Sequence, residues 1–495
     1  MKVYWALSVF AFLVLSAAAV WMGGLNQDEG WYLYAANLVS EGRLPYRDFF
    51  YTQGPLLPLV YSLFTPIWGL GGLLGARIFT LTIGAAGIAI AMRLSHHLAP
   101  EGRKGHAAVI TLLLLGCNLY HVYYLAIPKT YALASLLVMM GFWLLCRGSD
   151  EFYAKRHMAV AGAGFCLALA AGARISLGAL LATTALCLAF ARRWRTFVVF
   201  SAAGVVGLAL VYGPFLIDAK ALDGFLLAQR YHAARGGSDI VWTVGSLSRL
   251  VRWYLPMFVL LGLWAFVRPA MSSFRKDNPI PLVAYMLLFG FLAVFVVQML
   301  APYPYEDYQV PVMGLLAVVA SVGAVTVFEE HGLGRMALLL ALGMSFAASF
   351  GSPLLEKWST DGQDRFWAIK KSESELSRLR SVAAKIEKLD PGGKTLLTQD
   401  LYLAIETGRK VPDGLEMGPF SMLSDMEWRS LLTSAPCPVA ALSGYSFAVN
   451  PPVCDERPVE QQMEYWGLLK KDYELVSRVE AFGQNSTTLL ILRRN

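Results

Sequence analysis

Apolar segments of about twenty residues recur along the first two thirds of the chain, and short polar stretches separate them. Each segment is long enough for a helix to cross the hydrocarbon core of a bilayer. The pattern predicts about eleven spans, at residues 3–22, 73–95, 107–120, 128–146, 157–173, 175–191, 196–217, 251–267, 280–301, 309–328 and 335–351. We therefore expect an α-helical polytopic membrane protein whose transmembrane domain covers residues 1–351.

The stretch between the first two spans, residues 23–72, has a different pattern. Residues 32–38 are typical of an amphipathic helix whose aromatic side chains lie in the membrane interface. Residues 55–70 are apolar, but they are too short for a span and are interrupted by prolines. We expect a first loop that carries two juxtamembrane helices.

Beyond residue 351 the sequence becomes charged and mixed. An amphipathic helix is expected at 373–389, and strands are expected at 394–398, 439–442, 473–477 and 487–492. This length suits one small domain. We predict a C-terminal α/β domain over residues 352–495.

Composition and charge agree with a membrane protein and indicate its orientation. The chain is 56% hydrophobic and carries a net charge of +7, with 42 Lys and Arg against 35 Asp and Glu. The basic residues lie in alternate loops, at 103–104, 147–156, 192–195 and 268–276, rather than in one patch that would suit a nucleic acid. By the positive-inside tendency these loops are cytoplasmic. The N-terminus is then cytoplasmic, and residues 23–72 and 352–495 are expected on the opposite side of the membrane.

The first apolar run ends in small residues, as a cleaved signal peptide does, but its length and the further spans favour a retained helix. The six cysteines show no zinc-binding spacing. Cys437 and Cys454 lie in the part expected on that opposite side; if it is the periplasm, a disulfide can form there, although the sequence does not give their distance.

Two adjacent carboxylates, Asp28 and Glu29, follow the first span where it leaves the membrane. At a membrane edge such groups can act as a general base or as metal ligands; the alternative is a solvated loop turn. Neighbouring residues on a helix point about 100° apart, so both need not face one site. Asp28 is the first candidate for a catalytic base or metal ligand, and Glu29 assists it or has a structural role.

Further candidates lie in the other loops on the same side. Lys129 stands at a helix start, against both the positive-inside tendency and the helix dipole, which indicates an anionic partner such as a lipid phosphate; a snorkelling lysine is the alternative. Arg174 is a second phosphate ligand or a helix cap. The candidate substrate-binding residues are Tyr32, Gln53, His121, Lys129, Arg174, Arg230, Glu306 and Asp307. Glu306 and Asp307 lie among tyrosines, which also suits an aromatic belt.

The first loop resembles that of a known superfamily. The Asp-Glu-Gly-x-Tyr pattern at 28–32, the Leu-Pro-Tyr turn at 44–46 and the Pro-Leu pair at 55–56 resemble the GT-C glycosyltransferases, in their bacterial protein-mannosyltransferase-like and aminoarabinose-transferase-like branch. The resemblance implies a polyprenyl-phosphate-linked sugar donor. It also implies a periplasmic lipid, glycan or protein acceptor, a catalytic carboxylate at Asp28 and a divalent metal ion in some members.

Two positions depart from the pattern of that superfamily. Gln53 stands where many relatives have a lysine, and Lys129 stands near the position where relatives often have an acid. These departures put a donor-phosphate contact and a family-type metal site in question. A transporter or flippase of lipid-linked glycans and a catalytically silent scaffold are the alternative functions.

Overall fold

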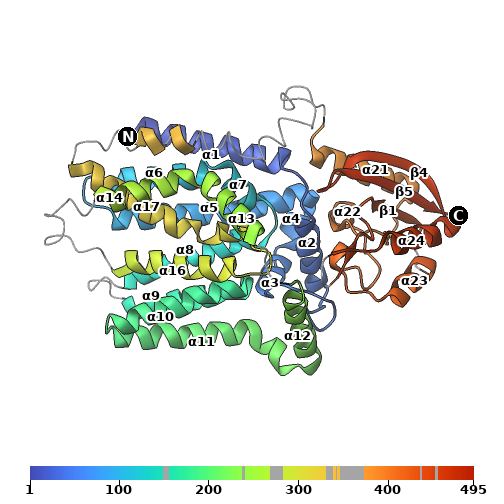
Figure 1. The fold of residues 1–495 in the computed structure, drawn as a ribbon, viewed down its shortest axis with the longest axis horizontal. Helices are drawn as coiled ribbons and strands as arrows, with labels where there is room; N and C mark the ends of the chain where they lie inside the picture. Colours follow the sequence, from blue (N-terminus) through green and yellow to red (C-terminus); the bar gives the residue numbers. More distant parts are fainter. Residues whose placement is uncertain are drawn as a thin grey trace.

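The computed structural model describes residues 1–148, 155–236, 240–267, 282–330, 338–341, 343–345, 373–434, 437–451 and 455–495. A bundle of long helices forms one end of the molecule and a smaller domain with a sheet forms the other, with the helices of the first loop between them (Figure 1). The N-terminus lies at the end of the bundle away from the sheet domain.

The bundle contains α1 (Lys2–Met22), α5 (Gly72–Leu98), α6 (Lys104–Gly116), α8 (Thr130–Gly148), α9 (Arg156–Ala173), α10 (Gly178–Phe190), α11 (Trp194–Ile217), α14 (Leu255–Val267), α16 (Leu282–Met299) and α17 (Val310–Glu330). Among the described residues, seven helices are long and apolar enough to cross a membrane, and α10 and α14 are shorter apolar helices. On the outside, α11 exposes Val198, Val205 and Leu210, as a lipid-facing helix does. The chain is a multi-pass membrane protein.

Nine of the first ten expected spans each coincide with one of these helices. The span expected at 107–120 is broken, because α6 ends at Gly116 and the chain turns by 70° into α7 (Leu119–Ala126); the two helices together are apolar enough to form one span. Asn118 begins α7 by accepting a hydrogen bond from the backbone N–H of His121, at 3.1 Å. The eleventh expected span, 335–351, lies mostly outside the described residues.

The first loop forms α2 (Gln27–Ser40), α3 (Leu56–Ser62) and the short α4 (Thr65–Trp68). The expectation that residues 32–38 lie in the lipid interface is wrong, because α2 buries Trp31, Tyr32, Leu33 and Tyr34 in succession and has no continuous exposed face. The helix α22 (Leu401–Thr407) of the C-terminal domain covers it. Gly30 allows this approach, since a Cβ there would lie 2.5 Å from the backbone nitrogen of Tyr402.

The C-terminal domain combines α21 (Glu375–Leu389), α22, α23 (Asp425–Ser434) and α24 (Val459–Asp472) with two antiparallel sheets. The first has the order β1-β5-β4, with β1 at Val439–Ser443, β5 at Thr487–Arg494 and β4 at Tyr473–Phe482; the second pairs β2 (Val449–Asn450) with β3 (Asp455–Glu456). The strand expected at 394–398 is reduced to isolated bridges, one of which pairs Leu397 with Ala440 of β1. The expected domain boundary at 351–352 and Cys454 lie outside the described residues.

Polar contacts attach this domain to the first loop. The side-chain amide of Gln27 donates to Asp400 at 2.6 Å, the backbone N–H of Val411 donates to the Tyr34 hydroxyl at 3.0 Å, and the backbone N–H of Leu73, at the start of α5, donates to Glu406 at 2.9 Å.

Two more helices, α12 (Ala219–Ala233) and α13 (Ile240–Trp253), lie beside the loop at this end of the bundle. The end of the bundle nearest the C-terminal domain is therefore enclosed by several elements.

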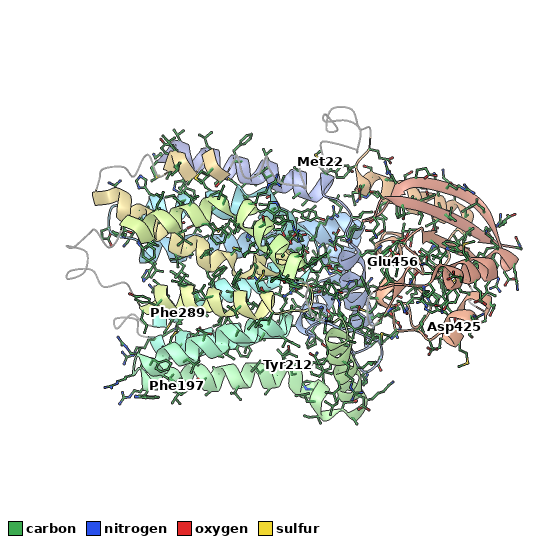
Figure 2. The ribbon with its side chains drawn as sticks, in the orientation of Figure 1. Met22, Phe197, Tyr212, Phe289, Asp425 and Glu456 are labelled. Atoms are coloured by element: carbon green, nitrogen blue, oxygen red, sulfur yellow. The ribbon has the colours of Figure 1, made fainter. Side chains whose placement is uncertain are left out.

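The two ends of the bundle differ in the loops they carry. Met22 lies at the end of α1 that faces the C-terminal domain, whereas Phe197 lies near the opposite end of the bundle (Figure 2). Phe197 follows the basic stretch 192–195 by two residues. The basic loop and the C-terminal domain are thus at opposite ends, as the charge pattern predicts.

Candidate functional site

Asp28 lies in the first turn of α2, at a helix start that the sequence itself fixes. The side chain of Asn26 accepts a hydrogen bond from the backbone N–H of Asp28 at 3.0 Å, and the backbone N–H of Asn26 donates to Glu29 at 3.0 Å. This reciprocal capping box satisfies two free N–H groups and begins the helix at this point. The positive end of the helix dipole then favours an ionised Asp28.

Glu29 does not face the same way as Asp28. Its two carboxylate oxygens accept from the Arg77 guanidinium of α5 at 2.6 and 2.7 Å, and both side chains are 0% exposed. Arg77 also donates to the backbone carbonyls of Val20, Gly23 and Gly24. Glu29 therefore holds the first loop on the bundle. Of the two roles that the sequence left open for Glu29, these contacts favour the structural one, since Glu29 does not line the cavity described next.

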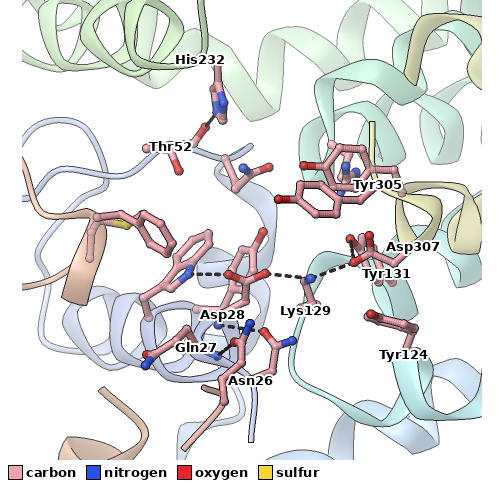
Figure 3. Close-up of a pocket in the computed structure, with 18 of the residues that line it drawn as sticks. Asn26, Gln27, Asp28, Thr52, Tyr124, Lys129, Tyr131, His232, Tyr305 and Asp307 are labelled. Carbon is pink, nitrogen blue, oxygen red and sulfur yellow. Dashed lines mark hydrogen bonds and ion pairs between the residues drawn. The ribbon is translucent and has the colours of Figure 1, made fainter. Parts of the chain in front are cut away.

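A cavity of about 320 Å³ lies between α2, the start of α8, the loop before α17 and the C-terminal domain (Figure 3). Candidates from four separate parts of the sequence meet there. The predicted residues that line it are Asp28, Tyr32, Gln53, Lys129, Arg174, Glu306 and Asp307. Its lining is mainly polar and aromatic, which suits a ligand with hydroxyl and charged groups.

Lys129 is central to the polar contacts of this cavity. Its ammonium lies 2.8 Å from Oδ2 of Asp28 and 3.1 Å from Oδ2 of Asp307, which also accepts from the Tyr131 hydroxyl at 2.8 Å. The other oxygen of Asp28 accepts from the Trp31 indole at 3.0 Å. Figure 3 shows Lys129 between Asp28 and Asp307 in this row of contacts. One ammonium thus links carboxylates that come from two different loops.

Asp28 and Lys129 hold each other in the ionised state. Burial acts to raise the pKa of Asp28, but the Lys129 ammonium outweighs it, with help from Trp31 and Arg174, and holds that pKa below its ordinary value. Burial acts to lower the pKa of Lys129, but Asp28, Tyr131 and Asp307 raise it well above its ordinary value. Asp28 is therefore a carboxylate and Lys129 an ammonium at neutral pH.

Arg174 forms another wall of the cavity. Its guanidinium lies 5.0 Å from the ring centre of Tyr131 and 4.7 Å from that of Tyr308, and it forms no ion pair with any described residue. It also lines an adjoining cavity of about 260 Å³, together with Ile175, Ala301 and Pro302. A cation without a carboxylate partner, placed between two cavities, is suited to bind an anion that enters from outside.

Glu306 lines the cavity, yet its carboxylate already has partners. Arg249 lies 3.1 Å from it and the Ser246 hydroxyl donates to it at 3.1 Å, both from α13. This contact attaches α13 to the loop that carries Asp307. Glu306 is therefore suited to position that loop.

Two predicted binding residues lie away from the cavity. His121 is buried in α7, with Nδ1 at 3.0 Å from the Tyr254 hydroxyl, and Arg230 is exposed on α12. Neither lines the cavity, so their assignment as substrate-binding residues is corrected. His121 is behind the site because the turn at Asn118 directs α7 into the protein, and Arg230 points away because α12 presents a different face to the cavity.

Several residues that line the cavity were not among the predicted binding residues. His232 and Arg235 come from the end of α12 and the residues after it, and the Nε2 atom of His232 lies 2.7 Å from the Thr52 carbonyl oxygen. The C-terminal domain contributes Met417, Phe420, Tyr445, Gln484 and Asn485. The backbone N–H of Gln27 donates to Gln484 at 2.7 Å, so the β4–β5 turn rests directly on α2. No local pattern marks this turn, because its role depends on packing between domains.

The described residues do not form a family-type metal centre. Within them, no group of three or more His, Cys, Asp or Glu side chains is placed to hold a metal ion. The two carboxylates nearest to each other across the cavity, Asp28 and Asp307, have the Lys129 ammonium between them. A divalent ion, which the sequence resemblance implies for some relatives, does not fit this arrangement.

Comparison with known proteins gives structural matches and no sequence matches. No family model matches the chain, and no curated protein matches it either. The structure of ArnT from Cupriavidus metallidurans bound to undecaprenyl phosphate is similar, with 14% identity, a TM-score of 0.65 and coverage of 99% of this chain and 97% of that chain. The oligosaccharyltransferase of Archaeoglobus fulgidus in its apo form is similar with 11% identity and a TM-score of 0.54, over 88% of this chain and 69% of that one.

A second structure of the Archaeoglobus fulgidus enzyme, a complex with Zn and sulfate, matches at 12% identity with a TM-score of 0.50, over 96% of this chain and 72% of that one. These proteins are glycosyltransferases of the GT-C class. The similarity covers both the helical bundle and the C-terminal domain. The chain therefore has the GT-C membrane fold, as the motifs of its first loop predict.

Proposed function

We propose that the protein is a membrane glycosyltransferase that transfers a hexosyl or pentosyl group from a polyprenyl-phosphate-linked donor to a periplasmic lipid, glycan or protein acceptor. The observation that carries the proposal is an ionised Asp28 that shares one cavity with Arg174, a cation that forms no ion pair with a carboxylate among the described residues. A negative group and such a positive group in one cavity match the two needs of such a transfer, which are to activate an acceptor and to stabilise a leaving phosphate.

Asp28 is suited to the acceptor half of the reaction. Its side chain is 29% exposed, whereas Glu29 is fully buried, so an acceptor hydroxyl can reach it. In the proposed step the acceptor oxygen attacks the anomeric carbon, the bond from that carbon to the phosphate oxygen breaks, and the acceptor proton passes to Asp28. Trp31 and Lys129 each bind one oxygen of Asp28 and so fix the direction of the carboxylate.

Arg174 is suited to the donor half. The phosphate that leaves carries negative charge away from the anomeric carbon, and a guanidinium binds phosphate oxygens in a bidentate manner. The adjoining cavity has Ile175, Ala301 and Pro302 in its wall, which suits the first part of an isoprenoid chain. Lys129, expected from the sequence to bind the phosphate, has both Asp28 and Asp307 as partners, so Arg174 is the stronger donor ligand.

The orientation in the membrane belongs to the same proposal. We place the N-terminus in the cytoplasm and the C-terminal domain in the periplasm of a bacterial inner membrane. The basic stretch 192–195, at the bundle end away from the C-terminal domain, favours this direction. The first loop and its cavity would then work on the periplasmic side.

The test is transfer by the purified protein in lipid nanodiscs, supplied with a panel of polyprenyl-phosphate sugars and with lipid, glycan and peptide acceptors. We expect the wild type to release free polyprenyl phosphate with at least one donor, and Asp28→Asn to release none. Asp413→Asn is the matched control, because Asp413 is an exposed acid of the C-terminal domain outside the cavity. Binding of donors without release of polyprenyl phosphate in any combination would favour a flippase and contradict the proposal.

A further inference from the structure

We propose that the Lys129 ammonium occupies the position that a divalent metal ion takes in a metal-dependent site, so that this cavity works without a metal. The inference rests on the proposed function for its catalytic meaning, but the binding property that it predicts can be measured without turnover. It assigns Lys129 as the resident cation of the cavity, in place of the phosphate ligand that the sequence predicts.

The geometry around Lys129 is the first argument. Its ammonium is 2.8 Å from Asp28 and 3.1 Å from Asp307, so it bridges carboxylates from the first loop and from the loop before α17. These are the distances of charge-assisted hydrogen bonds. A bridge between two acidic loops is what a bound divalent ion would provide, and here a side chain of the protein provides it.

The position of Lys129 is built into the fold. The residue is only 7% exposed, and its ammonium lies 4.9 Å from the ring centre of Tyr131 and 5.6 Å from that of Tyr124. Both rings favour a cation at this place. Its backbone N–H donates to the Ile127 carbonyl at 2.7 Å, in the turn between α7 and α8. The ammonium is therefore held between the carboxylates by the rings and the turn.

The remaining groups of the cavity do not complete a metal site. Glu306 is bound by Arg249 and Ser246, and the Nε2 atom of His232 contacts the Thr52 carbonyl. Divalent ions that bind oxygen take about six ligands. Here the Lys129 ammonium already binds one oxygen of Asp28 and one of Asp307, so these two carboxylates offer an ion only their remaining lone pairs. A divalent ion at bonding distance from Asp28 and Asp307 would also stand next to a positive charge.

The charge count leads to the same conclusion. Three acidic side chains (Asp28, Glu306 and Asp307) and three basic ones (Lys129, Arg174 and Arg235) line the same cavity. The protein thus balances the carboxylates with its own cations. The ammonium keeps Asp28 ionised and oriented, and Arg174 remains for the donor phosphate.

The test combines chelation with metal binding. After exhaustive treatment with EDTA, wild-type transfer should stay within about twofold of its untreated rate, because no metal takes part in the proposed site. A titration with Mn²⁺ followed by electron paramagnetic resonance should show no high-affinity ion bound by the wild type.

The second arm turns the position into a metal site. Lys129→Asp would place three carboxylates where the ammonium lay, and we expect this variant to bind a single Mn²⁺ that is lost when Asp28→Asn is added. Lys220→Asp is the matched control, because Lys220 is exposed on α12 and away from the cavity, and it should gain no Mn²⁺ site.

Two of the three contradicting results are measured by metal binding alone. A single high-affinity Mn²⁺ in the wild type that Asp28→Asn removes would overturn the inference, as would loss of transfer on chelation with recovery on Mg²⁺ or Mn²⁺. If a folded Lys129→Asp protein binds no Mn²⁺, the ammonium does not stand at a metal position. Because the wild-type titration needs no variant and no donor, failure of the proposed function would leave this test intact.

Discussion

Asp28 and Glu29 are neighbours in the first turn of α2, and their carboxylates lie in different surroundings. Glu29 is fully buried and receives two hydrogen bonds from Arg77, so both of its oxygens are used inside the protein. Asp28 is 29% exposed, lines the cavity and shares Lys129 with Asp307. The difference arises because adjacent helix residues point about 100° apart. A buried ion pair with matched partners holds the loop, while a carboxylate facing a cavity remains available to a substrate.

The largest difference between the two residues is expected in catalysis. Asp28→Asn should lower kcat/KM by about a thousandfold, because it removes the group that accepts the acceptor proton. The thermal midpoint should move little, since Asp28 is partly exposed, the amide oxygen can accept from one of the two donors, and Lys129 keeps Asp307 as a partner. Steady-state kinetics and thermal unfolding in the same nanodiscs measure both quantities. A rate equal to that of the wild type would remove Asp28 from the mechanism.

For Glu29 the large effect is expected in stability. Glu29→Gln leaves the Arg77 guanidinium buried with a neutral partner, which should lower the free energy of unfolding by about 3–5 kcal/mol. The double variant Glu29→Leu with Arg77→Met removes both charges. It should therefore be more stable than Glu29→Leu alone or Arg77→Met alone. Thermal unfolding of the three variants tests this order. Equal stability of Glu29→Gln and wild type would show that the pair does not hold the loop.

Arg174 extends the comparison to a cation that has no carboxylate partner. Arg174→Ala should raise the KM for the lipid-linked donor by about ten- to a hundredfold, the loss expected for hydrogen bonds to a charged group. The acceptor KM should change less. Arg230→Ala is the control, because Arg230 is exposed on α12 and does not line the cavity. An unchanged donor KM in Arg174→Ala would assign this arginine to packing against Tyr131 and Tyr308.

The smallest expected effect is a shift in pH dependence. Lys129 holds the pKa of Asp28 below its ordinary value, so wild-type kcat/KM should fall only when the pH drops below the usual range of an aspartate. Without Lys129 the largest remaining influence is burial, which raises the pKa of Asp28 against a smaller lowering by Trp31 and Arg174. The acidic limb of the profile for Lys129→Ala should therefore move to higher pH. Lys220→Ala, which alters an exposed lysine, should leave the limb in place.

The same shift has a consequence for stability. Because the pKa of Asp28 is lowered on folding, its contribution is present above the pKa of the unfolded state and is lost as the pH falls through the folded-state pKa. Removing Lys129 reduces or reverses the lowering of the Asp28 pKa, so Lys129→Ala should lose less stability through Asp28 than the wild type as the pH falls. Thermal midpoints recorded between pH 3 and 7 would detect the difference, and identical profiles for the two proteins would contradict the pairing.

The sequence predicted the fold where one physical requirement decides it. A bilayer requires about twenty apolar residues per span, so hydropathy located the helices of the bundle, including α1 and α5. The turn at Asn118 was missed because one capping side chain outweighs an apolar pattern that continues through it. The burial of α2 was missed because α22, far away in the sequence, covers it.

The sequence predicted single residues of the candidate site but not the contacts between them. Asp28, Lys129, Arg174 and Asp307 stood out because charges at membrane-helix ends are unusual, and the structure brings them into one cavity. Their partnerships were not predictable, since Lys129 and Asp307 lie 178 residues apart. Gln484 and Asn485 carry no local signal at all, because only the docking of the C-terminal domain brings the β4–β5 turn to the cavity.

The most direct measurement is a side-by-side comparison of Asp28→Asn and Glu29→Gln, with transfer rate per folded protein and thermal midpoint recorded for each in nanodiscs. The account predicts opposite patterns: Asp28→Asn keeps its midpoint and loses transfer, while Glu29→Gln loses stability and its folded fraction keeps a rate close to wild type. Loss of transfer by Glu29→Gln at an unchanged midpoint, together with a normal rate in Asp28→Asn, would contradict the assignment of Asp28 as the residue that faces the substrate.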